Sequence, residues 1–355
     1  MTQLTYHPKD YNAFIGLDVD KSNYSFTICN DTPQKISKRI PSNPEHLYNY
    51  IKKEFDCKKV ICAYEAGPTG FHLYDYLRRK GISCFITSAS SIPKAPNERV
   101  KNNRIDSGKI ADHLMSGKLK PIRVPEGIYR ELRHLAMIRE EYSAKRKVAK
   151  QQIKALLLYE NLYPLIKDAG SDWSNRYLHV LKIIPCSFAV RQRLDRLLDD
   201  LDYAHQKLQG INKTLTIFCQ EHEELKTYIH YLQSIPGIGF VIAVSLLGKI
   251  GDPAYLRDQR ELAAFMGLVP VEHSTGDSVQ KGSITRLGDK TIRFMMIEAA
   301  WVAIRLDKQL GQFYYRIKAK HHRQYASKVA ITAVARKLTQ IIYRVLKDKR
   351  EYIKY

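Results

Sequence analysis

Short, largely apolar runs separated by turn residues recur over the first part of the chain, which is typical of β-strands. Helical patterns with start and stop signals lie between these runs. The runs predict strands at 13–20, 24–30, 34–40, 58–66 and 83–89, and helices at 46–55, 70–81 and 105–119. The predicted order is therefore three strands, a helix, a strand, a helix, a strand and a helix. This is the element order of a ribonuclease H-like fold, which predicts an α/β domain over residues 1–125.

The pattern changes to long helices rich in Lys, Glu, Gln and Leu over residues 126–231. The apolar stripe along the first of these helices is imperfect, because Lys145 and Arg146 interrupt it. Such a stripe favours a helical hairpin or a coiled coil that binds a partner over a globular core. A solvated helical spacer is an equal alternative.

Residues 232–355 read as a compact helical domain with a helix-hairpin-helix-like motif. Its last helix places Ile331, Val334, Leu338, Ile341 and Val345 on one face. The segment IPGIG contains Gly237 and Gly239 just before an apolar helix. Two glycines at a helix start leave backbone amides open to a phosphate, although a packed corner between two helices is the alternative.

Lys and Arg number 58 against 36 Asp and Glu, which gives a formal net charge of +22. A surplus of this size indicates a polyanionic partner, and nucleic acid fits better than a membrane surface. No run approaches the length of a membrane span and no signal peptide is recognisable, so we expect a soluble, cytoplasmic protein. The six cysteines form no CxxC pair, which argues against structural zinc and against a disulfide framework.

Asp18 and Glu65 follow two apolar runs that the predicted fold makes parallel neighbours. Their carboxylates should then meet at one edge of the sheet. Asp106, at the start of the next helix, and Asn103, three residues earlier, are the candidates for further ligands. Hard divalent cations such as Mg²⁺ prefer oxygen ligands of this kind. Taken singly, each acid could be a strand-end or helix-capping residue; together they favour a metal site.

The stretch 267–293 sets small hydroxyl residues among glycines and cations without apolar periodicity, which is typical of a functional loop. Ser274 lies within it, in His273-Ser274-Thr275-Gly276. A serine attacks phosphorus only if a neighbouring group removes its proton and another stabilises the developing charge. The alternative is a serine that caps a turn.

These motifs together resemble one known family. The chain contains AFIGLDVDKS, YEA, RVKNNRIDSGKIADHL, SIPGIGFVIAVSLLGKIGD, GLVPVEHSTG and GSITRLGDKTIR in that order. The set is similar to the DEDD transposases of the insertion-sequence one-ten family over nearly the whole chain. The resemblance implies a RuvC-like nuclease domain with acids at Asp18, Glu65 and Asp106, joined through a coiled coil to a transposase domain whose nucleophile is Ser274. It also implies donor and target duplex DNA, a structured bridge RNA as guide, and a tetramer.

One position departs from the family pattern, because Asn103 stands where an aspartate is usual. An amide keeps an oxygen ligand but loses a charge, so Mg²⁺ binding should weaken. Asp112 is a poor substitute, since six positions from Asp106 correspond to about 240° around a helix. We expect further nucleic-acid contacts from the cations Arg99, Lys101, Arg104, Lys281 and Arg286.

The sequence thus predicts a DNA recombinase that moves an insertion sequence, with Ser274 attacking the scissile phosphate beside Mg²⁺. A junction-resolving nuclease of the same fold, in which water attacks, is the alternative. A nucleic-acid-binding relative without catalytic activity is a third interpretation, motivated by Asn103 and the positive charge.

Overall fold

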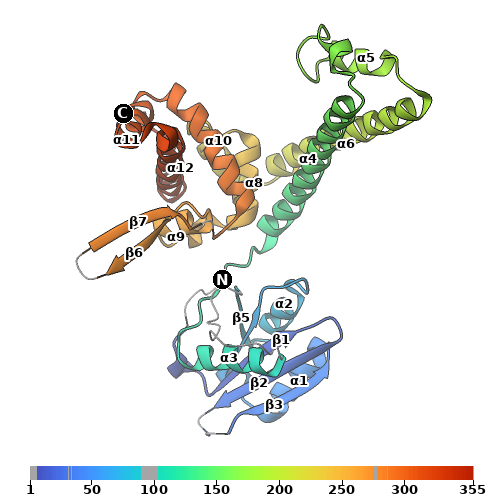
Figure 1. Cartoon of the computed structure of the whole chain (residues 1–355). Coiled ribbons are helices and arrows are strands. Elements are labelled where there is room, and N and C mark those ends of the chain that lie inside the picture. The colour runs from blue at the N-terminus through green and yellow to red at the C-terminus, as the bar shows by residue number, and fades with distance from the viewer. Residues whose placement is uncertain are drawn as a thin grey trace. The chain divides into compact units, whose positions relative to one another are not determined.

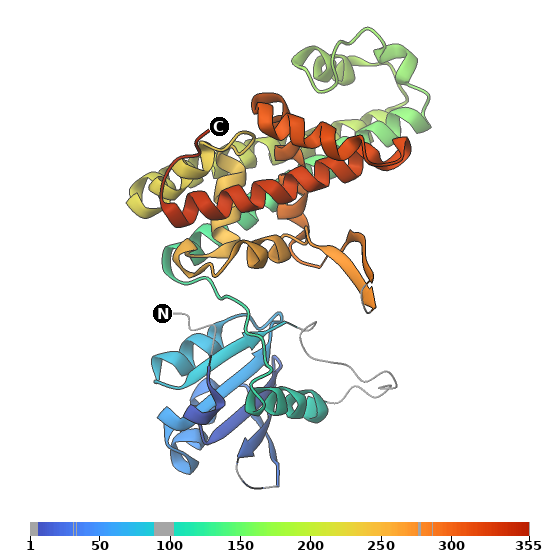
Figure 2. The ribbon, with the colours of Figure 1, turned by 90° about the vertical axis from the view of Figure 1, so that its left-hand side faces the viewer.

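The computed structural model describes residues 6–30, 32, 34–88, 103–275, 278–285 and 287–354, with the side chains of 103–105, 272–275, 278–281 and 323 outside this description. The chain forms two compact units, Met1–Val124 and Pro125–Tyr355 (Figures 1 and 2). Residues 126–231, which the sequence sets apart as a helical middle, pack in the same unit as residues 232–355.

The first unit has the predicted order of strands and helices. Its elements are β1 (Ala13–Val19), β2 (Asn23–Asn30), β3 (Ile36–Pro41), α1 (Pro44–Glu54), β4 (Val60–Glu65), α2 (His72–Arg79), β5 (Ser83–Thr87) and α3 (Asn103–Met115). The strands form one sheet in the order β3-β2-β1-β4-β5. β1 and β2 pair antiparallel, as do β2 and β3, whereas β1, β4 and β5 are parallel. This mixed α/β arrangement is consistent with a ribonuclease H-like fold.

Helices cover both faces of the central strands (Figure 1). On one face the core includes Ile15, Leu17, Cys62 and Tyr64 from β1 and β4 with Leu47, Ile51, Leu73 and Leu77 from α1 and α2. On the other face it includes Phe14, Ile61, Ala63 and Phe85 with Ile110, Ala111 and Leu114 from α3. Burial on both sides explains why β4 reads as a continuous apolar run.

Gly16 allows α3 to pack directly on β1. A Cβ atom added at Gly16 would lie 2.0 Å from the Ser107 carbonyl oxygen and 2.4 Å from the Ala111 nitrogen. No side chain fits there unless the helix moves. An isolated glycine within a strand pattern is the signal for such a close approach, and it could have been read from the sequence.

We expect Gly16→Ala to destabilise the first unit by at least about 2 kcal/mol, because the helix backbone must shift to admit the methyl group. The urea midpoint of unfolding, followed by circular dichroism, measures this loss. Gly108→Ala is the matched control, since nothing lies within 4 Å of the Cβ position at Gly108. The control should gain roughly 0.5–1 kcal/mol of helix stability. Equal midpoints for the two variants would contradict the close approach of α3.

The second unit begins with a long helical hairpin. α4 (Gly127–Tyr159) packs antiparallel to α6 (Phe188–Glu221), and α5 (Asn175–Ile183) lies at the far end (Figure 1). Arg139 donates a hydrogen bond from Nε to the side-chain oxygen of Asn212 at 2.9 Å, across the hairpin. Buried residues such as Ile153, Leu157 and Leu194 give the far end its own apolar core. The hairpin interpretation of this region therefore agrees with the structure, and a solvated spacer does not.

A helical bundle completes the second unit. Its helices are α7 (Glu223–Gln233), α8 (Phe240–Ile250), α9 (Gln259–Phe265), α10 (Lys290–Leu306), α11 (Lys308–Lys318) and α12 (Arg323–Asp348). The predicted apolar face of α12 is confirmed: Ile331, Val334, Leu338 and Val345 are buried, and Ile341 is half-buried against the same core.

Lys249 links the hairpin to the bundle. Its ammonium group on α8 lies 3.1 Å from Glu140 on α4 and 3.0 Å from Asp289 at the start of α10. Only 10% of the Lys249 side chain is exposed, so solvent screens these two ion pairs weakly. The adjoining Gly248 would place a Cβ 3.0 Å from the Arg133 backbone of α4. Close packing and shared charge therefore hold α4, α8 and α10 together.

The interpretation of residues 267–293 as a loop is wrong. Within it, β6 (Pro270–Thr275) and β7 (Ser278–Ile284) pair antiparallel in a two-stranded ribbon (Figure 1). Backbone pairing between the two strands needs no apolar face, so this ribbon leaves no alternation of apolar and polar residues in the sequence.

No helix in the described part of the chain has both the length and the apolarity to cross a membrane. All six cysteines are free thiols: Cys29, Cys62, Cys84 and Cys219 are buried, whereas Cys57 and Cys186 are half-buried.

Candidate active site

Asp18 and Glu65 lie side by side at the carboxyl ends of two neighbouring strands. β1 and β4 are parallel with Leu17 opposite Tyr64, and each acid is the next residue of its strand. Side chains alternate between the faces of a strand. Asp18 therefore shares a face with Phe14 and Gly16, and Glu65 shares a face with Ala63. Both acids belong to the face that α3 covers.

Tyr64 holds the end of β4 in place beside Glu65. Its hydroxyl donates to the Gly70 carbonyl oxygen at 3.1 Å and accepts from the Tyr74 amide at 3.2 Å. Burial raises the pKa of the Tyr64 phenol well above its usual range, so the group stays neutral. The strand end that carries Glu65 is thereby tied to α2.

Asp106 lies in the first turn of α3, next to Ser107. The Ser107 hydroxyl is buried and lies 2.9 Å from the Thr27 hydroxyl on β2. The backbone carbonyl oxygen of Ser107 faces Gly16, which lies two residues before Asp18. Phe14 shares a buried cluster with Leu114, so α3 runs opposite to β1 and its first turn lies toward the end that carries Asp18. The backbone thus places the first turn of α3 toward the end of the sheet at which Asp18 and Glu65 lie.

The donor atoms at this end of the sheet suit a hard divalent cation, because Asp18, Glu65 and Asp106 offer only oxygen. Across the residues that the structure describes, however, no three His, Cys, Asp or Glu side chains are gathered closely enough to hold a metal ion. The metal site at Asp18, Glu65 and Asp106 therefore stays a prediction. Asn103 is the first residue of α3, with its side chain outside the described set.

Asp112 is engaged elsewhere on α3. Its carboxylate lies 2.7 Å from the Lys35 ammonium group and accepts a weak hydrogen bond from the Cys29 thiol at 3.6 Å. Burial, followed by the charge of Asp112, raises the pKa of Cys29 to about 11, so this thiol stays protonated. These contacts with β2 and with Lys35 agree with its exclusion as a substitute ligand.

Ser274 belongs to β6, where it pairs with Val279 of β7. Its side chain lies outside the described set. The base of the β6–β7 ribbon is closely packed: a Cβ at Gly267 would lie 2.2 Å from the Leu287 oxygen, and one at Gly288 would lie 2.4 Å from the Phe265 oxygen. Both glycines have positive φ, at 65° and 111°. The segment that follows α9 and the segment that precedes α10 therefore pack against each other at the base of the ribbon.

The two glycines before α8 have different surroundings. Gly237 has φ 86°, and a Cβ there would lie 2.2 Å from the Ala299 oxygen of α10. It is thus a packing position. Gly239 is the N-cap of α8, without a side-chain cap and with nothing within 4 Å of its Cβ position. Phosphate binding by the amides of this first turn stays a prediction, and Gly239 is the position at which it can be tested without a packing clash.

The cations that the sequence predicts to contact nucleic acid have no side chain within the described part of the structure. Arg99, Lys101 and Arg286 lie outside the described residues. Arg104 in α3 and Lys281 in β7 are described in backbone only. Their contacts with nucleic acid stay predictions.

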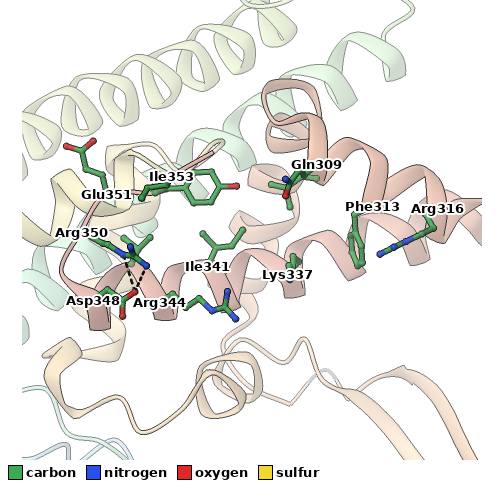
Figure 3. A pocket seen from close by; sticks show the side chains of 13 residues that line it. Gln309, Phe313, Arg316, Lys337, Ile341, Arg344, Asp348, Arg350, Glu351 and Ile353 are labelled. Atoms are coloured by element: carbon green, nitrogen blue, oxygen red, sulfur yellow. Dashed lines mark hydrogen bonds and ion pairs between the residues drawn. The ribbon is translucent and has the colours of Figure 1, made fainter. Parts of the chain in front are cut away.

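A pocket of 380 Å³ between α11, α12 and the C-terminal segment is separate from these residues (Figure 3). Phe313 and Ile341 line it together with Lys337. Arg350 donates to Asp348 at 2.9 Å along its wall, as the dashed lines show. No predicted catalytic residue lines this pocket.

Two protein-family models match the chain at the two places where the candidate residues lie. The DEDD transposase model of IS110 elements matches residues 15–160, which contain Asp18, Glu65 and Asp106. The model described as the transposase IS116/IS110/IS902 family matches residues 229–315, which contain the start of α8 and Ser274. Fold and matches together define a DNA transposase.

Relatives match along nearly the whole chain. A putative transposase of Sinorhizobium fredii is 26% identical over 96% of this chain and 90% of its own length. The transposases of insertion elements from Leptospira borgpetersenii (IS1533) and Coxiella burnetii (IS1111A) are 22% and 23% identical, over 81% and 95% of this chain and 84% and 90% of their own lengths. The chain belongs to the IS110 family of transposases.

Proposed function

We propose that this transposase cuts and rejoins DNA through a covalent bond between Ser274 and the scissile phosphate. The neighbouring positions of Asp18 and Glu65 at two parallel strand ends, with the first turn of α3 toward the same end, support the metal-dependent part of this proposal. The family resemblance alone supports Ser274 as the nucleophile. Mg²⁺ bound by Asp18, Glu65 and Asp106, with Asn103 assisting, would stabilise negative charge on the phosphate oxygens and lower the pKa of a bound hydroxyl group.

The chemistry at phosphorus is a substitution followed by its reverse on a new strand. The Ser274 oxygen forms a bond to phosphorus, and the bridging oxygen of the cleaved strand leaves with the bonding electrons and takes a proton. A free strand end then attacks the phosphoserine, forms a new phosphodiester and returns the proton to the serine. The bond energy is conserved between the steps, so rejoining needs no nucleotide cofactor.

The acids belong to the first compact unit and Ser274 to the second. We propose a RuvC-like domain over 1–125, a helical linker over 126–231 and a transposase domain over 232–355, whose residues meet in one site upon assembly. A site completed within a tetramer, with donor and target duplexes and a structured guide RNA bound, would limit stray cleavage. The family resemblance alone supports the guide RNA and the tetramer.

A denaturing gel tests the proposed function. The purified protein is incubated with Mg²⁺ and labelled duplexes that carry the junctions of its own element, together with the transcript of the flanking non-coding segment. A labelled band that migrates with the protein, and that protease removes, is the expected result. Nicked DNA without such a band would favour attack by water, as in a junction-resolving nuclease. The absence of both would favour a binding protein without catalytic activity.

We expect Asn103→Asp to lower the Mg²⁺ concentration needed for half-maximal cleavage, because a carboxylate adds charge and a second oxygen where the amide offers one. A Mg²⁺ titration of the nicking rate measures the shift, with Asn102→Asp as the matched control for added charge. An unchanged or higher requirement in Asn103→Asp alone would contradict its role as a ligand.

A further inference from the structure

A groove of 620 Å³ runs along α4 in the second unit, between the first turns of α10 and the segment that precedes α5. Arg139, Arg146, Lys147, Lys150 and Lys154 line it. Arg139, Arg146, Lys150 and Lys154 follow one another at spacings of seven, four and four along α4, and Lys147 lies seven before Lys154, so the cations share one face of the helix. None of them is among the predicted catalytic or phosphate-binding residues.

The groove keeps a surplus of positive charge. Its one lining acid, Glu140, pairs with Lys249, and Lys154 pairs with Asp172 at 2.6 Å. Arg146, Lys147 and Lys150 form no ion pair with any residue that the structure describes. Burial, and then the charges of Arg146 and Lys154, lower the pKa of Lys150. Crowding of like charges in this way is unfavourable unless an anion binds among them.

Two aromatic side chains stand along the same groove. Phe294 on α10 is 62% exposed. Trp173 has a φ of 67°, a left-handed conformation that is strained for a bulky residue. The Lys150 ammonium group lies 4.7 Å from the centre of the indole ring. Trp173 is half-buried, and its ring centre lies 5.4 Å from that of Tyr177, so Phe294 is the more exposed of the two rings. An exposed ring beside cations matches the two parts of a nucleotide, since rings stack on bases and cations contact phosphates.

We propose that this groove binds an unpaired strand of nucleic acid, with Arg146, Lys147 and Lys150 on successive phosphates and a base stacked on Phe294. A duplex fits less well, because its bases are already stacked on one another and cannot lie on the ring. The inference goes beyond the proposed function, since a strand could bind here whether or not Ser274 is the nucleophile.

The phosphate contacts are tested by removing two charges at the groove and two elsewhere. Arg146→Gln/Lys147→Gln is compared with Arg193→Gln/Arg196→Gln, which loses the same charge on α6. Fluorescence anisotropy with a labelled single-stranded oligonucleotide, in DNA and in RNA form, gives affinity against salt concentration for the full chain. Affinity falls as salt rises, so the slope of log affinity against log salt is negative. In the groove variant this slope should become less steep by about 1.4, or 0.7 for each lost phosphate contact. Equal slopes in the two variants would overturn the proposal.

The stacking contact is tested with Phe294→Ala against Phe188→Ala, since Phe188 is 81% exposed at the start of α6. We expect roughly tenfold weaker binding of a single-stranded probe for Phe294→Ala, no change for the control, and no change for either on a duplex. A loss on the DNA probe, the RNA probe or both supports the proposal, and a loss on one probe alone identifies the sugar. An equal loss on duplex, no loss at all, or displacement of the oligonucleotide by poly-glutamate at equal charge would overturn it.

Discussion

Replacing Ser274 with alanine should reduce strand exchange on the order of 10⁴-fold or more, because the variant lacks the atom that bonds to phosphorus. The change removes one hydroxyl and no charge, so the affinity for DNA should stay within about twofold of the parent. Backbone pairing of position 274 with Val279 does not depend on the side chain, so the ribbon should keep its structure. Protein-linked DNA on a denaturing gel, with binding measured separately, checks both expectations.

Thr275→Ala is the matched control for Ser274→Ala. Thr275 also carries a hydroxyl, lies in the same strand and pairs with Ser278. The Thr275→Ala variant should keep most of the strand-exchange activity if Ser274 is the nucleophile. A covalent adduct that persists in Ser274→Ala and disappears in Thr275→Ala would move the nucleophile by one residue. An adduct that persists in both variants would assign the nucleophile to a different residue.

Asp18→Asn and Glu65→Gln should each lower the cleavage rate by at least about a thousandfold, because each removes a charge from the proposed cation site while the side-chain volume is nearly unchanged. Both residues lie at strand ends. Their neighbours Leu17 and Tyr64 are the buried residues and stay unchanged, so the fold should tolerate the amide side chains. A partial rescue by Mn²⁺, which binds weak oxygen sites more tightly than Mg²⁺, would support a ligand role over a structural one.

Asp112→Asn is the matched control for these two variants. Asp112 is also a carboxylate beside the sheet, but it pairs with Lys35 at a half-exposed position, where an ion pair contributes about 0–1 kcal/mol to stability. Its cleavage rate should stay near that of the parent. A rate loss equal to that of Asp18→Asn would contradict the assignment of the ligands to the corner formed by β1, β4 and α3.

Most of the first unit could be predicted from local patterns. The strands that carry Asp18 and Glu65 are apolar runs of strand length, and Asn43 caps α1 through its side chain, as the helix-start signal indicates. The β6–β7 ribbon could not be predicted, because its two strands stabilise each other by backbone pairing and show no apolar period. The isolated Gly16 within a strand run indicates a close approach of some other group, but only the structure shows that α3 makes it.

The candidate site also has features that the sequence predicts and features that it does not. Parallel pairing of two buried strands predicted that Asp18 and Glu65 lie together, because the carboxyl ends of such strands meet at one edge. The different surroundings of Gly237 and Gly239 were beyond prediction, since the contact with Ala299 joins positions far apart in the sequence. The groove along α4 was missed for the same reason: Trp173 and Phe294 come from segments that only the folded chain brings beside Lys150.

By itself the sequence determined the family, the order of elements and the residue types available for chemistry, because these depend on composition and on neighbours within a few positions. Only the tertiary structure decided which glycines are packing positions, that Asp112 is occupied by Lys35, and that α4, α8 and α10 are joined through Lys249. These contacts depend on distances of a few ångströms between residues remote in the chain, and close packing and Coulomb attraction act only at such distances.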